Sequence, residues 1–435
     1  MTQATGYPLQ GDGRSHGLWE STAPAAPATT AHSGHAKADV AVIGGGYTGL
    51  STALRLSEMG ASVIVLEAVE IGFGGSGRNA GLVNAGMWMM PDDVARTLGE
   101  PYGNRLLEML GDAPRFVFEL VQRHHIDCEL ERAGTLHCAV GPRGLRNLAQ
   151  RVAQWSARGA AVRLLDAKET AAKVGSPAFS GSLLDLRAGT IQPLAYARGL
   201  ARAALDSGAR IFTGSRVVGA ERDSTGWIVS TAGGSVHAEW VVVATDTYAT
   251  APWREVQSEQ IRLPYFNFAT GPLEPALRAS ILPGRQGCWD TRWLLSSFRL
   301  DQAGRLIFGS FGALRGVGAH VHEAWAKRAL RQIFPQLGGV EFEAGWYGNI
   351  GMTDDNLPRF HKLAPQVIGF SGYNGRGIAP GSVLGRILAD YISGAVTDSD
   401  LPLPVTTARE PRFRGLREAF YEVGSGVAHL AGARF

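Results

Sequence analysis

The sequence predicts a mixed α/β fold in which a Rossmann-like domain is joined to a discontinuous second domain built on an antiparallel or mixed β-sheet. Three observations support this prediction. The β-branched run Val40–Ile43 leads into a Gly-x-Gly-x-x-Gly motif at residues 44–49 and then into a segment with helical spacing. An apolar strand, a glycine-rich turn and a helix follow one another again at residues 367–393. Between these regions, alternating and aromatic-rich runs separated by Pro, Gly and Asp are typical of antiparallel strands.

Composition limits the class of protein. Of the 435 residues 45% are hydrophobic, which is enough for a large core and two or three domains. The net charge of +3 is small and no block of like charges occurs, so we expect no nucleic-acid partner. We also expect no transmembrane segment, because no run of about 18 apolar residues is present. The amino terminus lacks the pattern of a signal peptide, and the three cysteines are scattered, which together predict a cytoplasmic protein.

Residues 1–37 are rich in Ala, Pro, Thr, Gly and His and show no periodicity. We therefore expect an extended segment there, with Leu18-Trp19 packing back onto the body. We expect His16, His32 and His35 to be solvated loop side chains, and we assign no metal site.

The motif at 44–49 and the acidic residue after the next strand predict a dinucleotide site. Gly44 permits a tight turn, Gly46 lets the backbone approach a pyrophosphate, and Gly49 lets the helix lie close to the sheet. The amino terminus of that helix favours phosphate. Glu67 directly follows the strand expected at 62–66. Its carboxylate would accept both ribose hydroxyls and repel a 2′-phosphate, so the ligand is FAD or NAD rather than NADP.

The loop from Ile71 to Leu82 is too rich in glycine to be core. Its backbone amides and Arg78 are suited to form a second wall around the phosphates, and Gly81-Leu82 would then run beside a ring system. The alternative is a flexible surface turn.

These motifs resemble those of the D-amino-acid oxidase-like (DAO) superfamily of FAD-dependent oxidoreductases, in particular the branch that contains gamma-glutamylputrescine oxidoreductases, monomeric sarcosine oxidase and bacterial L-pipecolate oxidases. The resemblance spans about residues 18–394 and implies FAD as the cofactor. It also implies that residues 375–379, in the glycine-rich turn at 372–379 (the late turn), lie with their backbone beneath the flavin pyrimidine. A helix amino terminus there would stabilise reduced flavin. The cofactor-binding residues that the motifs and the resemblance imply are Gly44, Gly46, Tyr47, Thr48, Gly49, Glu67, Ala68, Ser76, Gly77, Arg78, Asn79, Gly81, Leu82, Val217, Ala244, Thr245, Gly375, Arg376, Gly377, Ile378 and Ala379.

Periodicity places the remaining elements. We expect helices at about 101–123, 145–158, from 167, 194–207, 321–333 and 382–393. We expect strands at about 136–140, 209–212, 216–222, 227–231, 236–244, 260–269, 293–299 and 305–309. The FAD-binding domain would comprise residues 38–105, 187–258 and 345–395, the substrate domain 106–186 and 259–344, and a C-terminal extension 396–435.

The second domain should cover the flavin ring, and we expect its pocket to include Tyr265, Phe311, Trp346 and Asn349. Core packing is the alternative for each aromatic. The sequence departs from monomeric sarcosine oxidase at three places. Gly351 and Met352 stand where that enzyme attaches its flavin to a cysteine, so the FAD should be noncovalent. The lysines near its flavin have no counterpart in residues 305–309 or at Ala379, which puts fast use of oxygen in question.

The function we hypothesise is oxidation of the C–N bond of a primary or secondary amine, or of an amino or imino acid, by hydride transfer to flavin N5. Oxygen, or a quinone or carrier protein, would accept the electrons. No catalytic residue is assigned. We expect most of the rate acceleration to come from the geometry in which the substrate binds and from electrostatic stabilisation of the reduced flavin. Two alternatives stay open: an FAD-bearing subunit or binding module without independent activity, and an NAD-dependent dehydrogenase.

Overall fold

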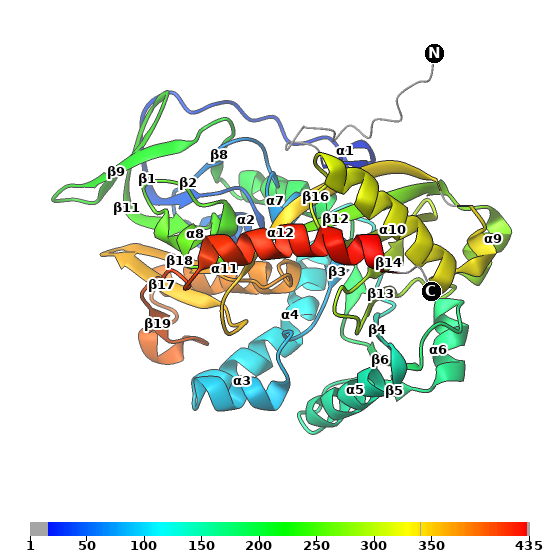
Figure 1. The fold of residues 1–435 in the computed structure, drawn as a ribbon. Coiled ribbons are helices and arrows are strands. Elements are labelled where there is room, and N and C mark those ends of the chain that lie inside the picture. The colour runs from blue at the N-terminus through cyan, green and yellow to red at the C-terminus, as the bar shows by residue number, and fades with distance from the viewer. Residues whose placement is uncertain (1–15, 340, 433–435) are drawn as a thin grey trace, which may run out of the picture.

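The computed structural model describes residues 16–339 and 341–432 as two β-sheets with helices packed around them (Figure 1). The first sheet contains β1 (Gly34–Ile43), β2 (Val63–Leu66), β8 (Arg210–Phe212), β9 (Val217–Arg222), β10 (Trp227–Thr231), β11 (Gly234–Val243), β17 (Arg359–Ala364), β18 (Val367–Ser371) and β19 (Val405–Thr406). Its order is β19-β17-β18-β11-β1-β2-β8; β10 pairs with β11, and β9 pairs with β10. The neighbours β18, β11, β1, β2 and β8 are parallel, which confirms the Rossmann-like prediction.

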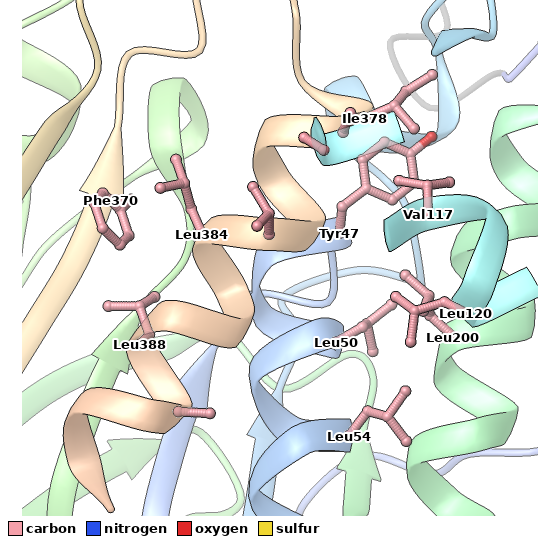
Figure 2. Packing of buried hydrophobic residues seen from close by; sticks show 14 of the residues in the cluster. Tyr47, Leu50, Leu54, Val117, Leu120, Leu200, Phe370, Ile378, Leu384 and Leu388 are labelled. Atoms are coloured by element: carbon pink, nitrogen blue, oxygen red, sulfur yellow. The ribbon is translucent and has the colours of Figure 1, made fainter. Parts of the chain in front are cut away.

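One face of this sheet is covered by four helices, α2 (Tyr47–Glu58), α4 (Tyr102–Arg123), α7 (Pro193–Asp206) and α11 (Ile378–Ile392). Leu50 and Leu54 of α2 face Leu200 of α7 and Leu120 of α4, whereas Leu384 and Leu388 of α11 lie beside Phe370 of β18 (Figure 2). Small residues let these helices approach closely. A Cβ added at Gly385 of α11 would lie 2.5 Å from the carbonyl oxygen of Thr48 in α2. The early and late helices are therefore packed directly against each other.

The second sheet is mixed. It contains β4 (Thr135–Ala139), β5 (Val162–Leu165), β6 (Gly181–Asp185), β12 (Ile261–Pro272), β13 (Gly287–Asp290), β14 (Ser297–Leu300), β15 (Arg305–Phe311) and β16 (Phe342–Met352). Its order is β16-β12-β15-β14-β13-β4-β6-β5, antiparallel except for the pair β13 and β4. The pair β3 (Leu82–Val83) and β7 (Gly189–Thr190) stands apart from both sheets.

The other described helices cover the second sheet or the edges of the molecule (Figure 1). They are α1 (Leu18–Thr22), α3 (Pro91–Leu98), α5 (Gly141–Ser156), α6 (Ala167–Val174), α8 (Glu255–Ser258), α9 (Pro275–Ser280), α10 (Val317–Ile333) and α12 (Arg414–Ala431), with short 3-10 turns η1 (Gly75–Gly77), η2 (Asp246–Tyr248), η3 (Pro335–Leu337) and η4 (Asp398–Asp400). Among the described residues, every helix is too short or too polar to serve as a membrane span.

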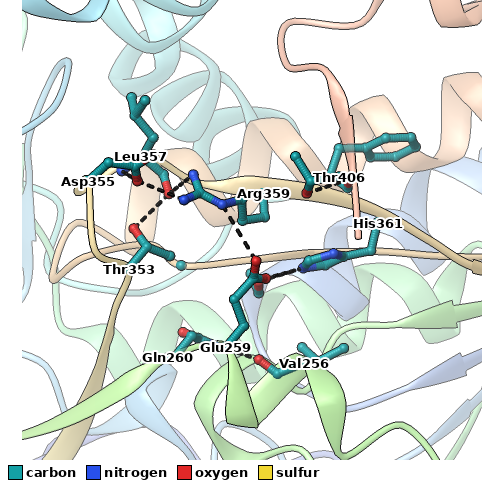
Figure 3. Close-up of polar contacts among 12 residues, drawn as sticks. Val256, Glu259, Gln260, Thr353, Asp355, Leu357, Arg359, His361 and Thr406 are labelled. Atoms are coloured by element: carbon teal, nitrogen blue, oxygen red, sulfur yellow. Dashed lines mark hydrogen bonds and ion pairs between the residues drawn. The ribbon is translucent and has the colours of Figure 1, made fainter. Parts of the chain in front are cut away.

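A buried polar network joins the chain before β12 to β17 of the first sheet (Figure 3). Glu259 lies 3.7 Å from Nε of Arg359 and 3.2 Å from Nε2 of His361. Burial raises the pKa of Glu259, and it lowers the pKa of His361 to about 4. These contacts fix one sheet against the other beside the late loop at 353–357.

Several expectations need correction. The segment expected to be extended contains two regular elements, since α1 covers Leu18–Thr22 and β1 begins at Gly34; residues 1–15 of that segment lie outside the described residues. No strand forms at Trp293, because the carboxylate of Asp290 accepts the N–H groups of Arg292 and Ser296 and closes a turn there. The last helix of the first domain starts at Ile378 rather than 382.

The expected histidine environment is also wrong for two of the three side chains. His16 and His32 are 1% and 3% exposed, since His16 Nε2 bonds to the Gly72 carbonyl and His32 packs on Phe212. His35 is exposed, as expected. His16 also faces the carboxylates of Glu20 and Glu70, and Glu20 in turn pairs with Arg198.

Candidate cofactor and substrate site

One cavity of about 770 Å³ lies between the two sheets and is lined by both of the glycine-rich turns that the sequence singles out. Its lining includes the carboxyl ends of β1, β2 and β11, the loop at 73–80, and Gly375, Gly377 and Ile378 at the start of α11. From the second sheet it receives Leu263, Tyr265, Trp289, Ser297 and Phe311. Ligands of open α/β sheets bind at the carboxyl ends of the strands, so the cavity stands where the topology places a ligand.

The glycine-rich turn at residues 44–49 (the early turn) depends on glycine for its shape. Gly44 has φ 111°, a conformation that side-chain-bearing residues rarely adopt, and its N–H donates to the carbonyl of Leu66. A Cβ at Gly49 would lie 2.0 Å from the Gly44 carbonyl oxygen. Only glycine therefore lets α2 begin this close to the end of β1, with the helix amino terminus directed at the cavity.

Glu67 holds the early turn from the neighbouring strand. One carboxylate oxygen accepts the N–H of Gly45 at 2.6 Å and the other accepts the N–H of Val69 at 2.9 Å. Burial raises the pKa of Glu67, while these backbone donors lower it. Because each carboxylate oxygen has more than one acceptor position, the residue can still receive hydroxyl donors from the cavity.

The loop at 75–81 is fixed by bonds from three directions. The phenol of Tyr47 donates to the carbonyl of Ser76, and Asn79 Nδ2 donates to the carbonyls of Gly75 and Ser76. From the second sheet, Asn267 Nδ2 and Trp346 Nε1 donate to the carbonyl of Arg78 at 3.1 and 3.0 Å. This loop is a rigid wall rather than a flexible surface turn.

The late turn meets the early turn directly. The hydroxyls of Thr48 in α2 and Tyr373 lie 2.6 Å apart, although 325 residues separate them in the sequence. Asp246, just after β11, accepts the N–H of Gly372 at 2.9 Å. Burial raises the pKa of Asp246 to about 6.

Most of the predicted site residues line this cavity. They are Gly44, Gly46, Tyr47, Thr48, Glu67, Ala68, Ser76, Arg78, Asn79, Leu82, Val217, Ala244, Thr245, Gly375, Gly377 and Ile378, together with Tyr265, Phe311 and Asn349 of the expected pocket. The cofactor and substrate roles of these residues remain predictions.

Six predicted residues lie behind the wall. Gly49 supports the early turn from below, and a Cβ at Gly77 or Gly81 would collide with a backbone carbonyl. Arg376 donates to the carbonyl of Ala85 and lies against the rings of Trp88 and Trp289, while Ala379 is fully buried in α11. Trp346 is also fully buried, because its ring packs on Trp19 while its N–H reaches Arg78.

The sequence interpretation missed part of the lining. Asp246, Trp88 and Trp289 also line the cavity. The position of Asp246, directly after the predicted strand end at Ala244-Thr245, could have indicated it. No spacing rule indicates the two tryptophans. The added tryptophans make the end of the cavity near the second sheet strongly aromatic.

Comparison with known proteins agrees with this geometry. The model of the family described as "FAD dependent oxidoreductase" (DAO) matches residues 39–391. The gamma-glutamylputrescine oxidoreductase of Escherichia coli (strain K12) is 32% identical over 394 residues, which cover 90% of this chain and 92% of that protein. The probable oxidoreductase OrdL of Rhizobium meliloti (strain 1021) is 31% identical over 393 residues, with 88% and 89% covered.

Solved structures share the fold. Glycine oxidase from Geobacillus kaustophilus has a TM-score of 0.68 at 21% identity, over 83% of this chain and 96% of that one. L-proline dehydrogenase from P. horikoshii has a TM-score of 0.67 at 17% identity, over 84% and 97%.

Proposed function

Because the chain belongs to the DAO family of FAD-dependent oxidoreductases, we propose that it holds FAD noncovalently in this cavity and oxidises the C–N bond of a small amine or amino acid. The FAD-dependent family removes the NAD-dependent alternative. The names of the relatives support the substrate class, since they include a gamma-glutamylputrescine oxidoreductase and a glycine oxidase.

The residues of the cavity fit FAD on two structural observations. The early turn leaves a cradle that side chains would fill, since a Cβ at Gly46 would lie 2.8 Å from Ser76 Oγ and would narrow the approach to the helix amino terminus. The hydroxyl of Thr245 is buried at the wall of the cavity and finds no hydrogen-bond partner among the described residues. A buried hydroxyl without a partner is costly, and a polar ligand group would satisfy it.

A noncovalent link is supported by the positions of the cysteines. All three are buried and unpaired, and none of them lines the cavity. Their unpaired state also supports the expected cytoplasmic location.

We assign the parts of the cofactor to opposite walls. Glu67 and Val217 would hold the adenosine, the amino terminus of α2 the pyrophosphate, and the start of α11 the flavin pyrimidine. The single observation that carries this assignment is the contact between Thr48 and Tyr373, which brings both turns to one cavity.

When bound, FAD would supply the acceptor for a hydride, which carries both electrons, from the carbon next to the substrate nitrogen. The chain would contribute position and environment. Tyr265, whose hydroxyl lies 2.7 Å from Ser297 Oγ and whose ring packs edge-on against Phe311, forms a rigid apolar surface that orients a small substrate and excludes water. The amino terminus of α11 places a positive dipole where negative charge develops on reduction.

The lining of the cavity also bears on the electron acceptor of the reduced flavin. No lysine lines the cavity among the described residues, so a lysine cannot assist oxygen from the wall. We propose oxygen, or a quinone or carrier protein, as the acceptor, and comparing reoxidation of the reduced protein by air and by a soluble quinone decides between them.

Anaerobic mixing of the purified protein with a panel of primary amines, secondary amines and amino acids tests the function. We expect the visible flavin absorption to bleach with at least one of them, and the product to be an imine or its hydrolysis products. Bound flavin that no amine reduces would instead favour the alternative of a subunit without independent activity. A colourless protein that binds no FAD would contradict the assignment altogether.

A further inference from the structure

The C-terminal helix α12 exposes an apolar stripe along its whole length. Its members follow one another at spacings of three and four residues, and each is between 49% and 74% exposed: Phe413, Leu416, Phe420, Val423, Val427 and Leu430. This helix lies outside the segment that matches the family model, which ends at residue 391. In Figure 1 it runs across the outside of the molecule beside α10.

The face of α12 that points inward is polar, which is the reverse of an ordinary surface helix. Glu418 accepts the N–H of Arg262 at 3.0 Å, and Glu422 pairs with Arg315 through both carboxylate oxygens. Farther along, His429 and Ser425 are buried, and His429 Nδ1 lies 2.8 Å from Nδ1 of His322 in α10. The polar contacts hold the helix to the body, so burying the apolar stripe is not what attaches it.

From this arrangement we infer that α12 is a dimerisation helix and that its apolar stripe packs against the same stripe of a second copy of the chain. Spacing of three and four residues puts the five side chains within the helix, from Leu416 to Leu430, at positions a and d of a heptad, the pattern by which two helices pack knobs into holes; Phe413, the cap residue, extends the stripe at its start. Such a seam complements itself, as a twofold interface requires.

The residues beside the seam fit a helical partner. Four of the five described flanking positions are small, Ala419, Gly424, Gly426 and Ala431, and Arg417 is the fifth. A Cβ at Gly426 would meet nothing within 4 Å, so packing within the chain does not require glycine there. Small residues beside the seam allow a second helix to come close.

The area also suits a dimer. With ordinary side-chain areas, the six residues expose on the order of 700 Å² of apolar surface, whereas a standard interface buries about 800 Å² per partner and a monomer rarely exposes so large a patch. The helix is already folded on its own body, so association would not have to nucleate it. A lipid surface fits less well, because membrane-surface helices are rich in Lys and Arg, and here Glu418 and Glu422 offset the basic residues.

Sedimentation velocity of the full-length, FAD-loaded protein at micromolar concentrations tests the inference. We expect a species of twice the chain mass. Val423→Glu places two carboxylates near the centre of the seam and should raise the dimer Kd by a factor on the order of 100. Val218→Glu, at a valine in β9 that is 58% exposed, should leave the dimer unchanged. Bound FAD reports that both variants are folded.

A second variant reads the contact directly. Val423→Cys should form a disulfide between copies under mild oxidation, because residue 423 lies near the centre of the seam. The natural cysteines are buried and should not compete for it. A monomeric wild-type protein, or a Val423→Glu protein that dimerises like the wild type, would overturn the inference. So would a monomer that floats with vesicles of anionic phospholipid through this helix.

Discussion

Asp246 is a partly buried carboxylate at the wall of the cavity, and its environment predicts an unusual dependence of stability on pH. Its pKa is raised from 3.8 to about 6, chiefly by burial. The folded protein therefore binds this proton more tightly than the unfolded chain does. The contribution of Asp246 to stability is present below pH 4 and is lost as the pH rises to about 6, at a cost of about 3 kcal/mol.

Replacing Asp246 by Asn removes this titration while keeping an acceptor for the Gly372 N–H. At pH 8 the free energy of unfolding of Asp246→Asn should exceed that of the wild type by up to about 3 kcal/mol, and the difference should vanish near pH 4. Denaturant titrations of both proteins at the two pH values measure it. An equal difference at both pH values would show that the carboxylate is not the cause.

Trp346 was expected in the substrate pocket, but it is fully buried behind the loop at residues 75–81. Its indole N–H donates to the carbonyl of Arg78. Trp346→Phe keeps most of the ring and loses that bond, so stability should fall by about 1 kcal/mol and the Kd for FAD should rise several-fold. The KM for the amine should not change.

Trp227→Phe is the matched control, because Trp227 Nε1 donates to the carbonyl of Pro365 at the surface, away from the cavity. If Trp346→Phe alters the KM while FAD affinity stays the same, Trp346 acts in the pocket as the sequence suggested.

Single residues could be predicted where the chemistry restricts the residue type. The glycine motif and Glu67 follow from the geometry of a phosphate turn and a ribose. Trp88 and Trp289 could not be predicted, because aromatic side chains are as suitable for a core as for a pocket. Their place depends on contacts between residues far apart in the sequence.

At the scale of elements, the start of α2 depends on one close approach. Gly49→Ala would bring a methyl group to within 2.0 Å of a fixed carbonyl oxygen, so we expect a loss of several kcal/mol of stability and little bound FAD. Gly415 of α12 meets nothing within 4 Å, and Gly415→Ala should leave stability unchanged or raise it by up to about 1 kcal/mol. Thermal melts and flavin content of the two proteins compare them; equal behaviour would contradict the close packing of the turn.

The junction of α10 and α12 predicts sensitivity to acid. Burial lowers the pKa of His322 to about 4 and that of His429 to about 3, so both are neutral in the folded protein at pH 7. Because these values lie below the unfolded value of about 6.5, their contribution to stability is complete above pH 6.5 and is lost as the pH falls toward 4.

His429→Phe keeps the ring that stacks on Trp325 and removes one titrating group. The variant should be less stable at pH 7, because His322 loses its partner, but should lose less stability between pH 7 and pH 5 than the wild type. His35→Ala, an exposed histidine, is the control. Equal losses in wild type and His429→Phe would refute the burial argument.

Elements with clear periodicity could be predicted, and α4, α7 and β10 appear where they were expected. The helix α12 was not predicted, although its apolar spacing is regular. Its inward side is polar, so the usual rule that the apolar face meets the core does not apply to it.

At the scale of the whole molecule, we propose that the two sheets mark the two domains expected from the sequence. The strand β16 crosses the expected boundary at residue 345. Its residues on both sides of that boundary pair with β12, so part of the segment expected in the FAD-binding domain lies in the second sheet. Periodicity indicates each strand but not its partner, because pairing over hundreds of residues depends on how the whole chain packs.

On the proposed function, both glycine-rich turns hold one FAD. A crystal structure of the protein with FAD bound tests it most directly. We predict the adenosine beside Glu67 and Val217 and the flavin pyrimidine at the start of α11, in the cavity that Thr48 and Tyr373 close. Density for the flavin ring away from Gly377, or for FAD outside this cavity, would show that the two turns do not share one cofactor.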